Sequence, residues 1–213
     1  MPHQFGVPQE IIDKVYAREL GIEAFSPYLS PIHDRHVIGV NAAFLLGRWI
    51  DIVCWGDGSF YWKNKDELLK FRGLKVSFNH NTTNRRPGVV DVKYVERDNR
   101  HLMGLSTNRN MQVSWNKNTG AAAVNLAYHL GVKRVLLLGF DMSVNENRQQ
   151  HWHAHYPSAL KPRADRLLPF QKHLQSFKYI SNDLQKIKGF EILNVNVDSN
   201  IPFFKKVRLE EVL

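Results

Sequence analysis

The chain has 213 residues, of which 43% are hydrophobic and 23% are charged, a balance that is typical of a globular protein and argues against wholesale disorder. The single cysteine, Cys54, excludes an internal disulfide. The start shows no signal peptide, and no apolar run is long enough to span a bilayer, so we expect a cytoplasmic protein. The net charge of +9 permits anionic partners, but the basic residues are scattered, which favours a solvated basic surface over a nucleic-acid-binding face.

In the first half of the chain, short apolar runs alternate with helical patterns. Ile11, Ile12, Val15 and Tyr16 recur at helical spacing, and Gly21 follows as a stop signal. By such patterns we predict helices over residues 8–20, 42–48 and 64–71, a loop over 25–35, strands over 36–40, 50–55 and 74–78, and a weaker strand over 89–95.

The second half contains the clearest helix–strand unit. An alanine-rich stretch predicts a helix over residues 118–130, closed by Gly131. The apolar run that follows predicts a strand within 132–140, buried on both faces. We further predict an extended loop over 96–110, a helix over 165–188, a strand over 190–195, and a helical turn or tail over 208–213.

Strands that alternate with helices indicate crossover connections and a mostly parallel sheet. We therefore expect one α/β domain over residues 1–213 with a Rossmann-like three-layer fold, in which the strands near 36–40, 50–55, 74–78, 134–139 and 190–195 share one sheet. Ligands of such sheets bind at the carboxyl ends of the strands. That rule selects Asn41, Asp57, Asp141 and the segment 194–199, which includes Ser199.

Three sites in the sequence have a chemical reason to bind a ligand. Asn118, Thr119 and Gly120 open the alanine-rich helix, whose free N–H groups suit a phosphate, although simple capping explains the same residues. Asp57 lies between two glycines, which let the turn point its carboxylate outward, and an ordinary Asp-Gly turn is the alternative. Asp141 follows a buried strand and could bind a ribose hydroxyl or, with Asp57, a divalent metal.

A histidine cluster follows at alternate positions. His151, His153 and His155 would face one side of an extended segment, which suits zinc, a general base or a phosphate contact. A surface loop with solvated histidines is the alternative.

Five short sequence blocks, by their order and spacing, resemble those of a known protein family. The blocks are VIGVN at 37–41, DIVCWGD at 51–57, NTGAAA at 118–123, GVKRVLLLGFD at 131–141 and HW at 151–152. Over residues 36–213 the chain resembles a family of phage and prophage proteins. That family is similar to the bacterial lipooligosaccharide sialyltransferases, which have a Rossmann-like nucleotide-sugar transferase fold. It is also similar to the family that includes archaeal hydroxymethylpterin pyrophosphokinases.

The resemblance implies roles for particular residues. Asn41 and the helix start at Thr119 and Gly120 look like the groups that contact the cytidine nucleotide in the sialyltransferases, and Asp57 looks like the residue of their second loop. His153 or His155 looks like their general base. In those enzymes two tyrosines assist the leaving phosphate, whereas Met142-Ser143 stands here at the first aromatic pair.

The N-terminal segment departs from these families. They begin with a strand and a Gly-x-Gly-Pro-Ser phosphate loop, and the matching stretch here, residues 19–26, retains only Gly21. Glu23 would repel phosphate at this point. We therefore treat residues 1–35 as a divergent segment, with a helix in place of the first strand.

Three functions follow from these observations. The leading one is a glycosyltransferase-like protein that binds a nucleotide or nucleotide sugar and, if active, transfers a sugar from an activated phosphate donor to a hydroxyl acceptor. No cofactor is assigned to it, and Mg²⁺ is compatible with the site. The second is a pyrophosphokinase that holds Mg²⁺ between Asp57 and Asp141. The third is a non-catalytic phage structural or accessory protein that keeps the fold.

Overall fold

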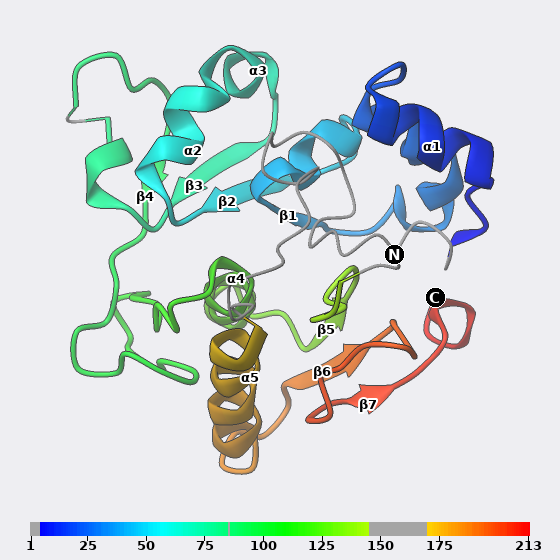
Figure 1. Cartoon of the computed structure of the whole chain (residues 1–213). Coiled ribbons are helices and arrows are strands. Elements are labelled where there is room, and N and C mark those ends of the chain that lie inside the picture. The colour runs from blue at the N-terminus through cyan, green and yellow to red at the C-terminus, as the bar shows by residue number, and fades with distance from the viewer. Residues whose placement is uncertain (1–4, 85, 145–169) are drawn as a thin grey trace.

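The protein is a mixed α/β chain in which every strand pair is parallel within the residues that the computed structural model describes, namely 5–84, 86–144 and 170–213 (Figure 1). The first sheet has the order β1-β2-β3-β4. Its strands are β1 (Ile38–Val40), β2 (Ile52–Trp55), β3 (Leu74–Ser77) and β4 (Lys93–Tyr94). The predicted strands over 36–40, 50–55, 74–78 and 89–95 are thus confirmed with shorter bounds.

A second, separate sheet contains the remaining strands. Its order is β5-β6-β7, with β5 (Arg134–Leu137), β6 (Glu191–Asn194) and β7 (Lys205–Lys206). The expectation of one continuous sheet is therefore wrong, because among the described strands β1 pairs with β2 alone, and β5 pairs with β6 alone. The expectation that β5 is buried on both faces is also wrong: Leu137 is buried, but Val135 and Leu136 are half-buried and Arg134 is exposed.

The N-terminal segment is helical, as predicted. Helix α1 (Gln9–Ala17) begins after Pro8 and ends at Arg18, whose left-handed backbone caps it before Gly21 is reached. The predicted loop over 25–35 is wrong: residues Ile22–Ile32 form the 3-10 helix η2. Both of its prolines fit there, because their fixed φ is close to that of a 3-10 turn.

Short helices connect the strands of the first sheet. The 3-10 helix η3 (Asn41–Leu46) follows β1, and α3 (Lys65–Lys70) occupies the helix predicted over 64–71. Helix α2 (Gly58–Lys63) was not predicted, because its Gly-Ser start reads as a loop. Asn64 does not cap α3 with its side chain and instead donates to the carbonyl of Phe60. The 3-10 helix η4 (His80–Thr82) follows β3.

Two long helices and a final turn complete the described elements. Helix α4 (Thr119–His129) matches its prediction closely. Helix α5 (Phe170–Leu184) lies within the helix predicted over 165–188, of which residues 165–169 fall outside the described part. The helical turn predicted at the end is the 3-10 helix η6 (Leu209–Glu211).

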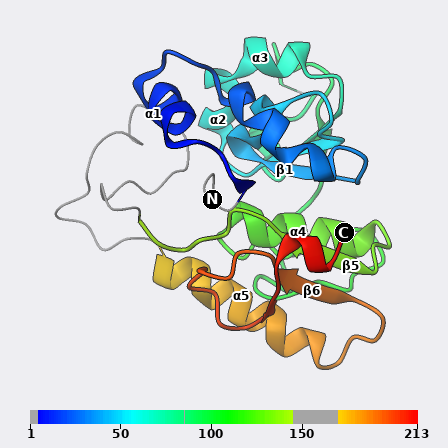
Figure 2. The ribbon, with the colours of Figure 1, turned by 90° about the vertical axis from the view of Figure 1, so that its right-hand side faces the viewer.

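Helix α4 is the element that joins the two sheets (Figure 2). Ala122, Ala123 and Leu126 pack with Phe78 of the first half, while Ala121 and Val124 pack with the core of the second half. The small side chains let the helix approach a sheet on each side, which explains its alanine-rich sequence.

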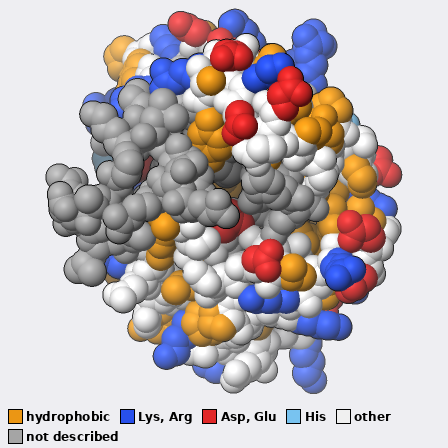
Figure 3. Space-filling view, turned by 45° about the vertical axis from the view of Figure 1, so that its right-hand side comes forward, with side chains coloured by type: hydrophobic (Ala, Val, Ile, Leu, Met, Phe, Trp, Pro, Cys, Tyr) orange, Lys and Arg blue, Asp and Glu red, His pale blue; other side chains and the backbone are white. Residues whose placement is uncertain are grey.

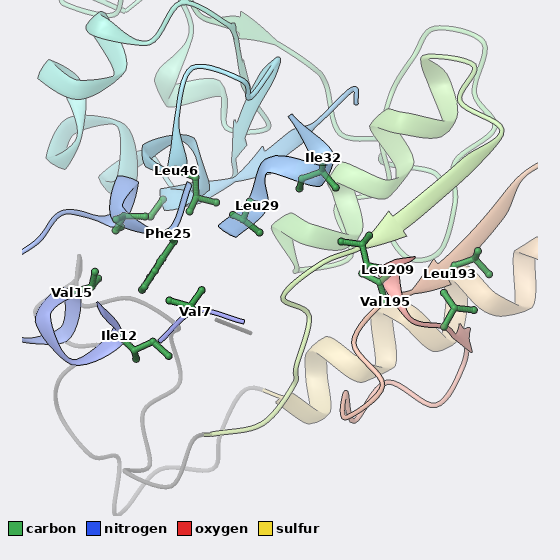
Figure 4. Packing of buried hydrophobic residues seen from close by; sticks show 13 residues of the cluster. Val7, Ile12, Val15, Phe25, Leu29, Ile32, Leu46, Leu193, Val195 and Leu209 are labelled. Carbon is green, nitrogen blue, oxygen red and sulfur yellow. The ribbon is translucent and has the colours of Figure 1, made fainter. Parts of the chain in front are cut away.

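A third apolar cluster ties the N-terminal helices to the second sheet (Figure 4). Phe25, Leu29 and Ile32 of η2 belong to the same cluster as Leu193 and Val195 around β6. Residues 5–35 are therefore an integral part of the core.

The surface carries mixed charge. On the face in Figure 3, lysine and arginine side chains alternate with acidic ones, in keeping with scattered basic residues. Across the described ranges, no helix combines the length and the apolar character that a membrane crossing requires.

Candidate functional site

A cavity of about 440 Å³ opens at the carboxyl ends of β1 and β5, beside the start of α4. Parallel strands bring their following residues to this edge. The structure gathers here six of the residues selected from the sequence: Asn41, Asp57, Asn118, Thr119, Gly120 and Asp141. Their roles in binding remain predictions.

The side chain of Asn118 caps the N-terminus of α4. Its side-chain oxygen accepts hydrogen bonds from the amides of Gly120, at 2.9 Å, and Ala121, at 3.3 Å. Its side-chain nitrogen donates to Ser176 Oγ of α5 at 3.0 Å. The amides of Gly120 and Ala121, which could otherwise hold a phosphate, are therefore already bonded. Thr119, which is half-buried, lines the cavity at this helix start.

Gly120 has a packing reason to be glycine. A Cβ at this position would overlap the ring of Phe140. That ring also packs edge-on against Phe177 at 5.7 Å between centroids. The glycine therefore lets the segment after β5 reach α4.

Asp141 is held by the loop after β6. Its carboxylate accepts from the side-chain amide of Asn196, and its backbone carbonyl accepts from the amide of Asn200 at 2.9 Å. Ser199 is buried, donates to the carbonyl of Phe140 at 2.6 Å and is not among the residues that line the cavity. The structure thus places Ser199 behind the site, where it fixes the backbone beside Asp141.

Three cavity residues have left-handed backbones although none is glycine. Asn41 has a φ of 52°, Lys117 of 50° and Met142 of 52°. Such conformations are costly for side-chain-bearing residues and are concentrated at functional sites. Their clustering around one cavity supports a role in ligand binding.

The sequence did not single out Trp115, which forms one wall of the cavity. The guanidinium of Arg97 lies 3.9 Å from the centre of its ring, and the same group donates to the carbonyls of Phe78 and Gly56. A glycine is required at position 56, because a Cβ there would overlap the Trp115 ring. The indole is therefore held rigidly; no motif in the sequence marks it.

Two basic side chains also line the cavity and were missed. Lys117 directly precedes the cap of α4, a position that could have suggested an anion contact. His173 lies in the first turn of α5, and burial lowers the pKa of its imidazole below the ordinary value. His173 is consequently neutral at pH 7 and can accept a proton.

Tyr16 of α1 lies close enough to Asp141 to interact with its charge. Burial, and then the carboxylate of Asp141, raise the pKa of the Tyr16 phenol to about 12. The phenol stays protonated at neutral pH, so α1 contributes a hydroxyl group near this side of the site.

The predicted histidine cluster and the predicted metal site have different outcomes. His151, His153 and His155 lie outside the described residues. Among the residues that are described, no group of three or more His, Cys, Asp or Glu side chains is arranged to hold a metal ion. Asp57 and Asp141 share the cavity without forming such a group.

Comparisons with protein-family models, with curated proteins and with solved structures found no match to this chain.

Proposed function

We propose that the cavity binds a nucleotide or nucleotide sugar. The observation that carries this proposal is the gathering of acidic, amide and basic groups, several on left-handed backbones, at the carboxyl ends of β1 and β5, each of which belongs to a parallel sheet. Open α/β sheets bind nucleotides at such a place. The same reasoning favours a Rossmann-like relationship for the fold.

Each part of such a ligand has a suitable neighbour. Lys117 supplies a positive charge for the phosphates, and Thr119 offers a hydroxyl beside it. The carboxylates of Asp57 and Asp141 can accept hydrogen bonds from ribose or sugar hydroxyls. Trp115 provides an apolar wall for a base, since its ring is already fixed by Arg97.

Group transfer would extend binding to catalysis. A sugar that leaves an activated phosphate needs a base to take the proton of the acceptor hydroxyl. His153 and His155 are the bases implied by the resemblance, and His173 is a neutral histidine at the cavity wall. Lys117 would stabilise the charge that develops on the departing phosphate.

A non-catalytic accessory protein is the second candidate, and one observation favours it. The side chain of Asn118 occupies the amides that a phosphate would use at α4. A protein that has kept the cavity without the phosphate loop would show this arrangement. The Mg²⁺-dependent pyrophosphokinase has no comparable support, since among the described residues no three His, Cys, Asp or Glu side chains gather around Asp57 and Asp141.

Binding is tested by a thermal-shift screen of nucleoside mono- and diphosphates and nucleotide sugars, with and without Mg²⁺. A ligand present at about a hundred times its Kd stabilises the fold by about 2.7 kcal/mol, which is a readily measured rise in Tm. If no compound stabilises the wild type at high concentration, the accessory-protein candidate replaces this proposal.

A pair of matched variants locates the ligand. Thr119→Arg fills the cavity at the start of α4 and should abolish the shift, while Thr107→Arg makes the same change at an exposed site elsewhere and should preserve it. His153→Ala and His155→Ala should keep binding and lose turnover. An unchanged shift in Thr119→Arg would exclude this cavity as the nucleotide site.

A further inference from the structure

A second cavity, of about 450 Å³, lies at the amino ends of β5 and β6, whereas the first cavity opens where β1 and β5 end. Its lining includes Lys133, which directly precedes β5, and Lys188, Gly189 and Phe190, which directly precede β6. Because β5 and β6 are parallel, their amino ends lie at one edge of the sheet. The length of the strands, at about 3.3 Å per residue, separates this edge from the first cavity.

Two similar turns bring the lysines to this edge. Gly131 follows α4 with a φ of 80°, and Gly189 precedes β6 with a φ of 75°, so each turn passes through a left-handed glycine. A Cβ at either glycine would meet no atom within 4 Å, so the backbone conformation, and not close packing, requires glycine there. The amide of Glu191 donates to the carbonyl of Lys133 at 2.9 Å, which fixes the two turns side by side.

The acidic side chain near these turns is neutralised by a different cation. Glu191, three residues after Lys188, accepts from Nε of Arg134 at 2.8 Å. Within the described ranges, neither Lys133 nor Lys188 forms an ion pair. Both lysines therefore keep their charges for another partner.

A third cation comes from the loop that precedes α4. Asn108 fixes the shape of this loop, because its Oδ1 accepts from the amide of Asn110 at 3.0 Å and its Nδ2 donates to Gln112 Oε1 at 2.7 Å. His129, at the end of α4, donates from Nε2 to the carbonyl of Gln112 at 2.8 Å and so binds the loop to the helix. From this fixed loop the exposed Arg109 lines the cavity, and it forms no ion pair with any described residue.

The second cavity therefore has an excess of positive charge. Arg109, Lys133 and Lys188 line it, and among the described residues of its lining there is no aspartate or glutamate. Tyr128 and Phe190, which also line it, pack edge-on at 5.2 Å between ring centroids. Apolar rings beside the cations lower the local dielectric constant, which strengthens the attraction of an anion.

We propose that this second cavity binds a ligand that carries two or three linked phosphate groups. One phosphate group has a charge of about −1.5 to −2 at pH 7, so it would leave part of the three positive charges unmatched, whereas a di- or triphosphate matches them. Lysine and arginine both bind phosphate oxygens, arginine through two parallel N–H groups. The volume of about 450 Å³ lies in the range of small-molecule sites.

This proposal does not depend on the nucleotide proposed for the first cavity. The first cavity places one lysine, Lys117, with the carboxylates of Asp57 and Asp141, so it suits a nucleotide with a base and a sugar better than a bare polyphosphate. Inorganic tripolyphosphate is therefore the probe for the second cavity. In the nucleotide screen Thr119→Arg changes the first cavity, and Lys133→Gln changes the second, so the failure of either proposal is recognised separately.

The test titrates the full chain with sodium tripolyphosphate in an isothermal titration calorimeter, at pH 7.5 without divalent metal. We expect one saturable site with a Kd below about 1 mM, and a Kd that rises with added sodium chloride because salt screens the charges. A Kd above about 1 mM, or no saturation, overturns the proposal.

Lysine-to-glutamine variants locate the site. Lys133→Gln and Lys188→Gln should each raise the Kd about tenfold, as expected for a lost charged hydrogen bond. The Tm without ligand should change little, because both side chains are exposed. Lys63→Gln removes the same charge from an exposed position on α2 and is the matched control, which should bind as the wild type does. An equal loss in Lys63→Gln would show a general attraction to the charge of the protein, and the proposal would be wrong.

A variant of the first cavity and a nucleic acid complete the test. Lys117→Gln should bind tripolyphosphate as the wild type does, and a tenfold loss would place the phosphates in the first cavity and overturn the proposal. A fluorescein-labelled single strand of about ten nucleotides, followed by anisotropy, should bind more weakly than tripolyphosphate because its phosphates are spread along the chain. If the oligonucleotide binds more tightly and Lys133→Gln weakens it, the ligand is a nucleic acid and the proposal is wrong.

Discussion

β2 and β5 have similar apolar sequences but very different surroundings. β2 lies between β1 and β3, and its Val53, Cys54 and Trp55 are fully buried. Among the strands that the structure describes, β5 has a neighbour on one side only, and of its four residues Leu137 alone is buried. An apolar run therefore indicates that a strand tends to be buried. The number of neighbouring strands determines how much of it is buried.

The two halves also differ in how they meet α4. The first half contacts it through Ala122 and Ala123, and the second through Ala121, Val124 and the ring of Phe140, which needs Gly120. If α4 couples the halves, a defect in either core should weaken the whole molecule. The predictions below test that coupling from the largest effect to the smallest.

The largest expected effect comes from the two cores. Phe78→Ala removes a fully buried ring beside α4 in the first half, and Phe177→Ala removes one in the second. Each should lower the free energy of unfolding by about 3–5 kcal/mol, through lost burial and a residual cavity. Denaturant unfolding followed by tryptophan fluorescence and by far-UV circular dichroism should give one coincident transition in both variants. Two transitions, with only one shifted by each variant, would show that the halves unfold independently.

A smaller effect is expected where the second half packs on α4. Gly120→Ala introduces a Cβ that overlaps Phe140, which should cost about 1–3 kcal/mol of stability. The double variant with Phe140→Leu should recover part of this loss, because the smaller side chain makes room, so the two substitutions should not be additive in denaturant unfolding. Full additivity would mean that the glycine serves another purpose.

The cap of α4 comes next. Asn118→Ala removes the acceptor for the amides of Gly120 and Ala121 and should cost about 1–2 kcal/mol, measured by the same unfolding experiment. Asn118→Asp keeps an acceptor and loses only the donor to Ser176, so it should cost less. Equal losses would show that the bond to α5, and not the cap, carries the stabilisation.

The success and failure of the sequence predictions follow from the range of the interactions involved. Helix α4 and strand β2 were predicted closely, because their periodicity and caps are local signals. Helix α2 and the 3-10 helix η2 were missed, because glycine, serine and proline indicate loops unless the surrounding core holds them. The division into two sheets could not be predicted, since it depends on which strand lies beside β1.

The candidate site divides in the same way. Asn41, Asp57 and Asp141 were found because each follows a strand, and parallel strands bring those positions to one edge. Trp115 and His173 were missed because their positions depend on the path of a long loop and on the docking of α5. Such long-range packing leaves no local pattern.

The smallest expected effect is a dependence of the free energy of unfolding on pH. It involves His173, which lies in the first turn of α5 and lines the cavity. Burial lowers the pKa of this imidazole in the folded state, so as the pH falls below the unfolded value of about 6.5 the unfolded chain gains a proton first. The free energy of unfolding should therefore decrease as the pH falls from about 7 through the folded pKa, and His173→Gln should remove that part of the slope. Asn110→Gln, at an exposed position that does not titrate, is the control variant and should keep the wild-type slope. Denaturant unfolding at a series of pH values measures both variants. If His173→Gln keeps the wild-type slope, the imidazole is hydrated in the folded protein, and His173 loses its support as the neutral base of the cavity.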